Sequence, residues 1–431
     1  MIKKINIILL LLALSVCAFG QTELSLMDAI QKALENNYDI RVQKMDENIA
    51  GINNNWGTAG RYPSISLSGN SNNKADFNTT DNYTQYQLIG GISLNWTLFD
   101  GFKVNITKQK LEELENLTKG YTAVLVEGTI QSVISTYYDV LLQQEILKVY
   151  QGNEQLSKDR VEYQQMKKDI GNLVSYEVLQ AQNAYLADKA SVLLQEATVK
   201  SAVRELVYLM GEESGNYRLN GTLEANISSY ELKDLTDAML QNNSNLKNQY
   251  INQTLTEKAT ALAKAGYYPK LSLAAGAQGV NLNSNYTSGA AINANSSNVY
   301  GNLSLTYNLF NGGVRKRALQ IAKIEEEMSN IETDAMQVSL TNQLANLYDY
   351  YQARMGMYDL AEERLKVAQI NLEISNEKFK AGTINSFNYR DVQLSYRQAA
   401  IDRLNAVYNL IDVNTSLLRL TGGIIEEYTA E

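Results

Sequence analysis

The feature that most constrains this chain is a strand pattern that turns into a helix pattern within a few residues, and it occurs twice. Residues 93–107 read SLNWTLFDGFKVNIT, and residues 304–315 read SLTYNLFNGGVR. In both, apolar and polar residues alternate up to a Leu-Phe pair, and an Asp-Gly or Asn-Gly break then opens a long helical pattern. Alternation predicts a strand with one apolar face, whereas a helix packed on helices repeats its apolar residues about every 3.6 positions. Each copy of the pattern therefore predicts that the chain passes, at that point, from a strand with one apolar face to a helix packed on other helices.

The rest of the chain shows the same duplication. The run AGRYP at residues 59–63 returns as AGYYP at residues 265–269, and beyond the strands Gly211 matches Gly422. A unit this long indicates a duplicated domain and not a solenoid repeat. The predicted organisation is a signal peptide (1–20), a first structural repeat (21–215), a second repeat with the same order of elements (216–425) and a C-terminal tail (426–431).

The first twenty residues have the plan of a secretory signal peptide. Lys3 and Lys4 precede an apolar run at residues 5–14, and AFG precedes Gln21. The run is too short to span a bilayer. A lipoprotein processing site that leaves Cys17 acylated is an alternative to simple removal. Both interpretations predict that the protein is exported.

Composition argues against an enzyme. The chain has no histidine, and its one cysteine, Cys17, lies in the signal peptide, so neither a metal site nor any cofactor is expected. The net charge of −9 gives it no reason to bind nucleic acid. Outside residues 1–20 no stretch reaches eighteen apolar residues, which predicts no transmembrane helix. If the chain crosses a membrane, strands must do it.

Each repeat contains one pair of alternating runs that predict strands with one apolar face. Leu94, Trp96 and Leu98 alternate with polar residues in the first repeat, as do Leu303 and Leu305 in the second. The segments between the paired runs, 70–85 and 281–298, are rich in Asn, Ser and Thr and are predicted to be solvent loops.

Four such strands are too few to form a closed structure. An antiparallel sandwich also has alternating strands, but four strands cannot cover a core on both faces, and lipid does not tolerate unpaired strand edges. Closure needs about eight strands, which three copies of this chain would exceed with twelve. Four aromatic residues cluster where strand becomes helix, and they fit a girdle at the membrane interface. They are Trp96, Phe99, Tyr307 and Phe310.

The remaining segments are predicted to be helical. Each repeat begins with a helix of about thirty residues, the first of which opens on a capping box of Ser25 and Asp28. Proline-free helices follow at residues 102–168 and 314–380, each with a return helix. The first return helix carries two neighbouring heptad rows, which indicate two packed neighbours. A lone coiled-coil hairpin would account for the helices but not for the strands.

The sequence resembles the TolC-type outer-membrane efflux channels over nearly the whole mature chain. The likeness lies in LSL at residues 24–26, YPSI at 62–65, LFDG at 98–101 and EVLQAQ at 177–182. It implies an α+β membrane protein whose homotrimer forms a 12-stranded β-barrel in outer-membrane lipid, continued by an α-helical barrel in the periplasm. It also implies two partners, a periplasmic adaptor protein and an inner-membrane pump.

The two turns between the long helices carry the sharpest functional predictions. Each turn is predicted to hold a left-handed glycine that ends one helix and a serine that caps the next. The resemblance implies that these tips contact the adaptor, with exposed Leu173 and Ile384 as principal candidates; a plain hairpin turn is the alternative. The candidate contact residues are Gly171, Leu173, Ser175, Gly382, Ile384 and Ser386.

Carboxylates just beyond the turns are candidates for a pore constriction. If Glu177 and Asp391 face the bore, threefold symmetry makes each a ring of three carboxylates that favours cations. In the family, aspartates near this point line the narrowest part. Asp391 matches one of them, whereas Asn388 stands at the other position and Ile384 replaces an arginine of the gate. The alternative for either carboxylate is a solvent-facing position on a helix.

The predicted function is a passive exit duct of an efflux or type I secretion system in the outer membrane, with its helices in the periplasm. A pump would supply the substrate through the adaptor. The alternatives are a periplasmic adaptor or a coiled-coil scaffold without a pore. An adaptor would need compact β domains, of which the sequence gives no sign.

Overall fold

The computed structural model describes residues 22–77, 82–215, 217–225 and 228–429. The predicted signal peptide and Cys17 lie outside these residues. The chain divides into two units, each described by itself: one of residues 1–43, 122–244 and 337–431, and one of residues 44–121 and 245–336. None of the described helices combines the length and the apolar character needed to cross a membrane.

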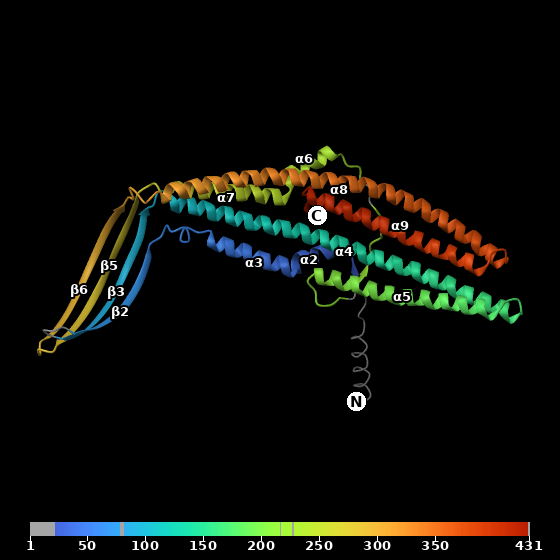
Figure 1. The fold of residues 1–431 in the computed structure, drawn as a ribbon, viewed down its shortest axis with the longest axis horizontal. Coiled ribbons are helices and arrows are strands. Elements are labelled where there is room, and N and C mark those ends of the chain that lie inside the picture. The colour runs from blue at the N-terminus through green and yellow to red at the C-terminus, as the bar shows by residue number, and fades with distance from the viewer. Residues whose placement is uncertain (1–21, 78–81, 216, 226–227, 430–431) are drawn as a thin grey trace, which may run out of the picture. The chain divides into compact units, whose positions relative to one another are not determined.

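The second unit contains a four-stranded antiparallel sheet (Figure 1). Its strands are β2 (Ser64–Asp76), β3 (Tyr83–Phe99), β5 (Lys270–Tyr286) and β6 (Ala291–Thr306), in the order β2-β3-β5-β6. The two hairpins of the repeats are thus joined through β3 and β5, whose register shifts once between Thr97 and Phe99.

The prediction of long solvent loops between the paired strands was wrong. Most of residues 70–85 and 281–298 belongs to the strands, and the pairing of β2 with β3 continues as far as Asp76 and Tyr83. Asn and Ser disfavour strands when judged residue by residue. A ladder that is already aligned extends through them, because each added pair satisfies backbone groups that would otherwise need water.

The single long helix predicted at the start of each repeat is in fact two helices. In the first repeat α2 (Leu26–Asn36) and α3 (Tyr38–Asn53) meet at Asn37, and in the second α6 (Leu232–Asn242) and α7 (Ser244–Ala265) meet at Asn243. The Asn37 side chain accepts hydrogen bonds from the backbone N–H groups of Asp39 and Ile40, which caps α3. Its Nδ2 donates to the carbonyl of Leu209 at 3.0 Å, and Asn243 bonds the carbonyl of Leu420 in the same way at 2.9 Å. The predicted capping box of Ser25 and Asp28 is confirmed.

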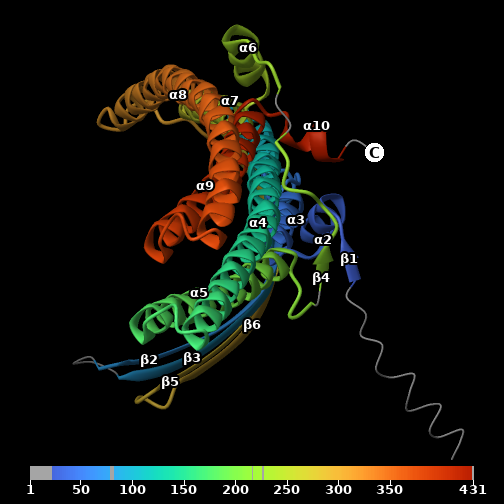
Figure 2. The same ribbon diagram turned by 90° about the vertical axis from the view of Figure 1, so that its right-hand side faces the viewer.

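The long helices are confirmed almost to the residue. They are α4 (Lys103–Asp169) and α8 (Val314–Lys380), of 67 residues each, and the return helices α5 (Ser175–Leu209) and α9 (Ser386–Leu420), of 35 residues each. At 1.5 Å per residue α4 and α8 are each about 100 Å long. In the first unit α5 lies beside α4, and α9 beside α8 (Figure 2).

The core of the first unit gathers apolar side chains from helices far apart in the sequence. Ile130, Ile134 and Tyr137 of α4 pack with Leu206 of α5 and Val407 of α9. The Tyr137 hydroxyl donates to the carbonyl of Leu24 at the end of β1 (Thr22–Leu24), which pairs in parallel with β4 (Tyr217–Leu219). The short α10 (Ile424–Thr429) adds Ile424 to this core.

Candidate channel wall and helical tips

The sheet has one apolar face and one polar face. Residues paired across neighbouring strands point to the same side, so the register defines rows that cross the sheet. Three successive rows on one face are apolar and together form what we call the apolar band. The rows are Trp96, Leu273 and Leu303; Ile65, Leu94, Ala275 and Gly301; and Leu67, Ile92, Ala277 and Val299.

In a single chain the apolar band is exposed. Leu67 and Val299 are each 85% exposed. A continuous exposed patch of this kind is costly in water. The next row of the same face ends the band, because it carries almost no side chains. It consists of Gly69, Gly90, Gly279 and Ser297.

Beside the apolar band the opposite face of the sheet is polar, whereas farther from the helices it also carries Ile89 and Val280, which are paired across β3 and β5. Ser66 and Ser93 are paired across β2 and β3, and their hydroxyls lie 2.9 Å apart in a hydrogen bond. Asn95 and Asn302 occupy another row of this face. The two faces therefore suit two different surroundings, an apolar one on one side of the sheet and water on the other.

Aromatic residues mark the end of the sheet next to the helices. The Trp96 indole N–H donates to the carbonyl of Arg61 at 2.9 Å, and Phe99 packs edge-on against Phe102. Phe99 is half-buried, whereas Tyr307 and Phe310 are exposed. The chain turns tightly here: a Cβ on Gly101, whose φ is +72°, would lie 2.5 Å from the carbonyl oxygen of Ala265.

The tip turns agree with the sequence in their glycines but not in their caps. Gly171 and Gly382 have φ values of +78° and +75°, so the predicted left-handed residues are confirmed. Ser175 and Ser386 are the first helical residues and not the caps. Val174 holds the cap position of α5 without a side-chain hydrogen bond, and the Asn385 side chain caps α9 by accepting from the N–H of Asn388.

Several apolar side chains are exposed at the tips, but they are not the ones expected. Leu173 and Ile384 are half-buried, so the expectation that both are exposed is corrected. The side chains that project there are Ile170, Val174, Tyr176 and Phe387, which are 63–70% exposed. Placement within a turn depends on backbone direction, which the sequence pattern did not resolve.

The structure places the three constriction candidates within the first two turns of the return helices. Glu177 is half-buried in α5, and Asn388 and Asp391 are exposed in α9.

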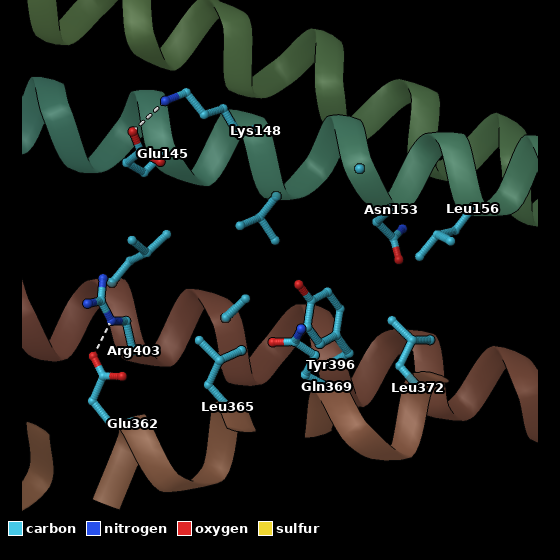
Figure 3. Close-up of a pocket in the computed structure, with 14 residues that line it drawn as sticks. Glu145, Lys148, Asn153, Leu156, Glu362, Leu365, Gln369, Leu372, Tyr396 and Arg403 are labelled. Carbon is cyan, nitrogen blue, oxygen red and sulfur yellow. Dashed lines mark hydrogen bonds and ion pairs between the residues drawn. The ribbon is translucent and has the colours of Figure 1, made fainter. Parts of the chain in front are cut away.

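A cavity of about 600 Å³ lies farther from the tips, among α4, α8 and α9 (Figure 3). Leucines of all three helices form much of its wall, and Asn153 of α4 extends into it. The cavity shows that the two hairpins are not packed uniformly along their length.

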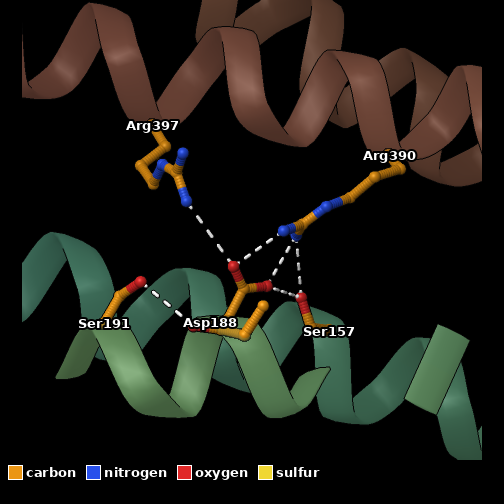
Figure 4. Close-up of polar contacts among 6 residues, drawn as sticks. Ser157, Asp188, Ser191, Arg390 and Arg397 are labelled. Atoms are coloured by element: carbon orange, nitrogen blue, oxygen red, sulfur yellow. Dashed lines mark hydrogen bonds and ion pairs between the residues drawn. The ribbon is translucent and has the colours of Figure 1, made fainter. Parts of the chain in front are cut away.

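Near the tips, a buried carboxylate joins the two hairpins (Figure 4). Asp188 of α5 accepts two hydrogen bonds from Arg390 of α9, from Nη1 at 2.6 Å and Nη2 at 2.7 Å, and Arg397 lies 3.5 Å away. The Ser157 hydroxyl of α4 donates to Asp188 and accepts from Arg390. The Asp188 side chain is 3% exposed and that of Arg390 is 16% exposed, so this is a buried, bidentate ion pair.

The charge of this cluster is not balanced. Burial, and then the nearby Arg390 cation, lower the pKa of Arg160 to about 10. Arg160 is therefore still protonated at neutral pH, and its buried Nε has no hydrogen-bond partner among the described residues. The sequence did hold a signal for the cluster: Asp188 falls on the buried stripe of α5, between Ala181 and Val192. A carboxylate on an apolar stripe requires a cation from a neighbouring element.

Comparison with known proteins agrees with this architecture. The sequence profile of the family described as "Outer membrane efflux protein" matches residues 29–212 and 235–423. A curated relative, the toxin and drug export protein A of Aggregatibacter actinomycetemcomitans, is 20% identical over 400 residues, which cover 91% of this chain and 85% of the relative.

Solved structures share the fold. The Campylobacter jejuni CmeC outer membrane channel superposes with a TM-score of 0.74 at 15% identity, over 92% of this chain and 85% of that one. Crystal structures of CusC give a TM-score of 0.76 at 16% identity, with 92% of each chain covered.

The alternative of a periplasmic adaptor is not favoured, because the matching family consists of outer membrane efflux proteins, which are channels and not enzymes. The resemblance noted in the sequence is thereby confirmed. This chain belongs to the outer membrane efflux protein family, and it is an outer-membrane efflux duct of the α+β, TolC-like fold whose long helices extend into the periplasm.

Proposed function

We propose that three copies of this chain close into a passive duct, with a twelve-stranded barrel in the outer membrane and a helical barrel in the periplasm. The observation that carries the proposal is the sheet. In the described residues β2 and β6 each pair on one side only, and the sheet has one apolar and one polar face. Joining β6 of one copy to β2 of the next satisfies both edges and leaves the polar face toward a water-filled bore.

The helices support the same assembly. Leu179, Leu186 and Leu193 follow one another at intervals of seven residues along α5, and they are 55–64% exposed in the single chain. A heptad row of leucines is typical of a helix that packs against another helix. A neighbouring copy would cover it.

The duct passes substrates that an inner-membrane pump hands over through a periplasmic adaptor. The proposed adaptor contacts are the tip residues named from the sequence, Gly171, Leu173 and Ser175 in the first repeat and Gly382, Ile384 and Ser386 in the second. The exposed Val174 and Phe387 extend this surface. The division of the chain into a first repeat (21–215) and a second repeat (216–425) is part of the same proposal, since each repeat would supply one hairpin to each barrel.

We test the duct with the purified protein in planar bilayers and on unheated gels. The expected results are discrete conductance steps and a band at three times the chain mass, which collapses to the monomer on boiling. A monomer of unchanged mobility without conductance would contradict the proposal.

The narrowest point would lie where Asp391, Glu177 and Asn388 of three copies meet. Asp391→Ala should lower the ratio of cation to anion permeability about twofold, since it removes three negative charges from the bore. Reversal potentials in a salt gradient measure this ratio. Glu325→Ala is the control, because Glu325 is an exposed carboxylate near the opposite end of α8. Equal reversal potentials for wild type and Asp391→Ala would refute the pore role.

A further inference from the structure

The cavity among α4, α8 and α9 has the size of a small-molecule site. Its volume of about 600 Å³ falls within the range of known ligand pockets, roughly 300–1,000 Å³. Leu156, Leu365 and Leu404 give it apolar walls from all three helices. An occupant would therefore bury apolar surface on each side.

One polar side chain in the wall has no partner. Asn153 is 4% exposed, and neither its Nδ2 nor its Oδ1 has a hydrogen-bond partner among the described residues. Buried amides are normally satisfied, because an unpaired donor or acceptor is costly. Asn153 points from α4 toward α8 and α9, into the space of the cavity (Figure 3). It offers one donor and one acceptor side by side.

The charged residues of the cavity lie at its other end and cancel one another (Figure 3). Lys148 Nζ lies 2.6 Å from Glu145 Oε1, and Arg403 Nε lies 2.6 Å from Glu362 Oε1. Since each cation is already paired with a carboxylate, the cavity provides no net charge for an ionic ligand.

We propose that this cavity binds a neutral, planar compound with an N–H and a C=O group on adjacent atoms, as in a lactam or a cyclic imide. The ligand N–H donates to Asn153 Oδ1, and the ligand C=O accepts from Asn153 Nδ2. The apolar rings lie between the leucines of α4, α8 and α9. The proposal rests on side chains of one chain alone, so its failure would leave the duct proposal intact.

The test uses two probes that differ in one hydrogen-bond donor. 2-Quinolone carries a lactam edge on a fused ring pair, and 1-methyl-2-quinolone has the same rings without the N–H. Equilibrium dialysis against the full chain in lipid nanodiscs measures both. Saturable binding of 2-quinolone is expected, with the methylated probe bound about tenfold more weakly because it leaves Asn153 Oδ1 unpaired.

Variants locate the binding. Gly152→Leu should abolish it, because Gly152 lines the cavity and a Cβ there would meet no atom within 4 Å, so the new side chain enters open space. Gly356→Leu is the matched control: Gly356 also lies in a long helix with no atom within 4 Å, but outside the cavity. Asn153→Leu should remove the preference for 2-quinolone over the methylated probe.

Three results would overturn the proposal. They are equal binding of the two probes by the wild type, unchanged binding by Gly152→Leu, and loss of the trimer in Gly152→Leu but not in Gly356→Leu. The last would mean that a neighbouring copy fills the cavity.

Discussion

The return helices α5 and α9 have equal lengths and equivalent places in the two repeats, yet the same positions face different neighbours. Leu179, Leu186 and Leu193 of α5 correspond to Arg390, Arg397 and Leu404 of α9, each 211 residues later. In α9 the two arginines reach the buried Asp188 of their own chain. In α5 the three leucines stay exposed.

The residues that contact the two arginines also change between the repeats. Ser157 and Asp188, which receive the arginines, correspond to Ala368 and Ala399 in the second repeat. Suppose that each α5 packs on the second hairpin of the next copy, as α9 packs on the first hairpin of its own chain. The leucines of α5 would then contact the alanines of that copy. The contact within the chain is then ionic and the contact between chains apolar. A buried ion pair admits few alternative registers, whereas apolar contacts tolerate several.

The strongest test of this comparison is a charged side chain in the leucine row of α5. Leu186→Arg should abolish the trimer, because each interface would bury an unpaired cation at a cost of about 3–5 kcal/mol. Size-exclusion chromatography in detergent measures the assembly. Gln180→Arg, at an exposed polar position of the same helix, is the control and should leave the trimer intact. A stable Leu186→Arg trimer would show that the row faces solvent.

The ionic contact can be broken in the same way. Asp188→Ala should destabilise the helical part by about 3–5 kcal/mol, since it leaves Arg390 buried without its carboxylate. Thermal melting followed by circular dichroism measures this. Asp402→Ala, which removes a partner of the more exposed Arg364, should cost less than about 1 kcal/mol.

A quadruple variant would then replace the ionic contact within the chain by the apolar pattern that we expect between chains. It combines Ser157→Ala, Asp188→Ala, Arg390→Leu and Arg397→Leu. Recovery of most of the lost stability is expected, because well-packed apolar groups often replace a buried ion pair without cost. No recovery would mean that the ion pair itself stabilises the fold.

The two helix junctions provide a comparison in which the repeats should behave alike. Asn37→Ala and Asn243→Ala should each cost about 1–3 kcal/mol, since each leaves the carbonyl of Leu209 or Leu420 without its side-chain donor. Chemical denaturation measures both variants. A large cost at one junction only would show that the two are not equivalent.

The smallest effect concerns the first helix of each repeat. Ser25→Ala should cost about 1 kcal/mol, and Glu231→Ser should gain a similar amount, because the Glu231 side chain makes no capping hydrogen bond for α6.

The effect at Ser25 should depend on pH. Hydrogen bonds from the Ser25 side chain and backbone lower the pKa of the Asp28 carboxyl. The stabilisation is thus complete above the ordinary carboxyl pKa, near 4, and is lost as the pH falls through the lowered value. Melting of wild type and Ser25→Ala at neutral and acidic pH checks this. The bond from the Asp28 backbone N–H to Ser25 Oγ does not titrate, so part of the difference remains in acid; a difference as large in strong acid as at neutral pH would contradict the role of the Asp28 carboxylate.

What the sequence predicted well rests on local or periodic information. Long helices follow from apolar spacing without proline, and the left-handed Gly171 and Gly382 follow from what ends a helix. The features that the sequence did not predict depend on contacts with residues far away in the chain. Asn37 breaks a helical pattern because it bonds Leu209 from another element, and the strands extend through Asn-rich segments because their partners are aligned. The Asp188 cluster joins three helices whose proximity no spacing reveals.

The row of Gly69, Gly90 and Gly279 has a mechanical consequence for the wall of the duct. Glycine positions are where a sheet concentrates its curvature, and here they lie abreast on three neighbouring strands. The strands would bend together at one level, directly beside the apolar band. In the proposed twelve-stranded barrel the mouth of the pore would then widen or narrow beyond that level while its diameter within the lipid stayed fixed.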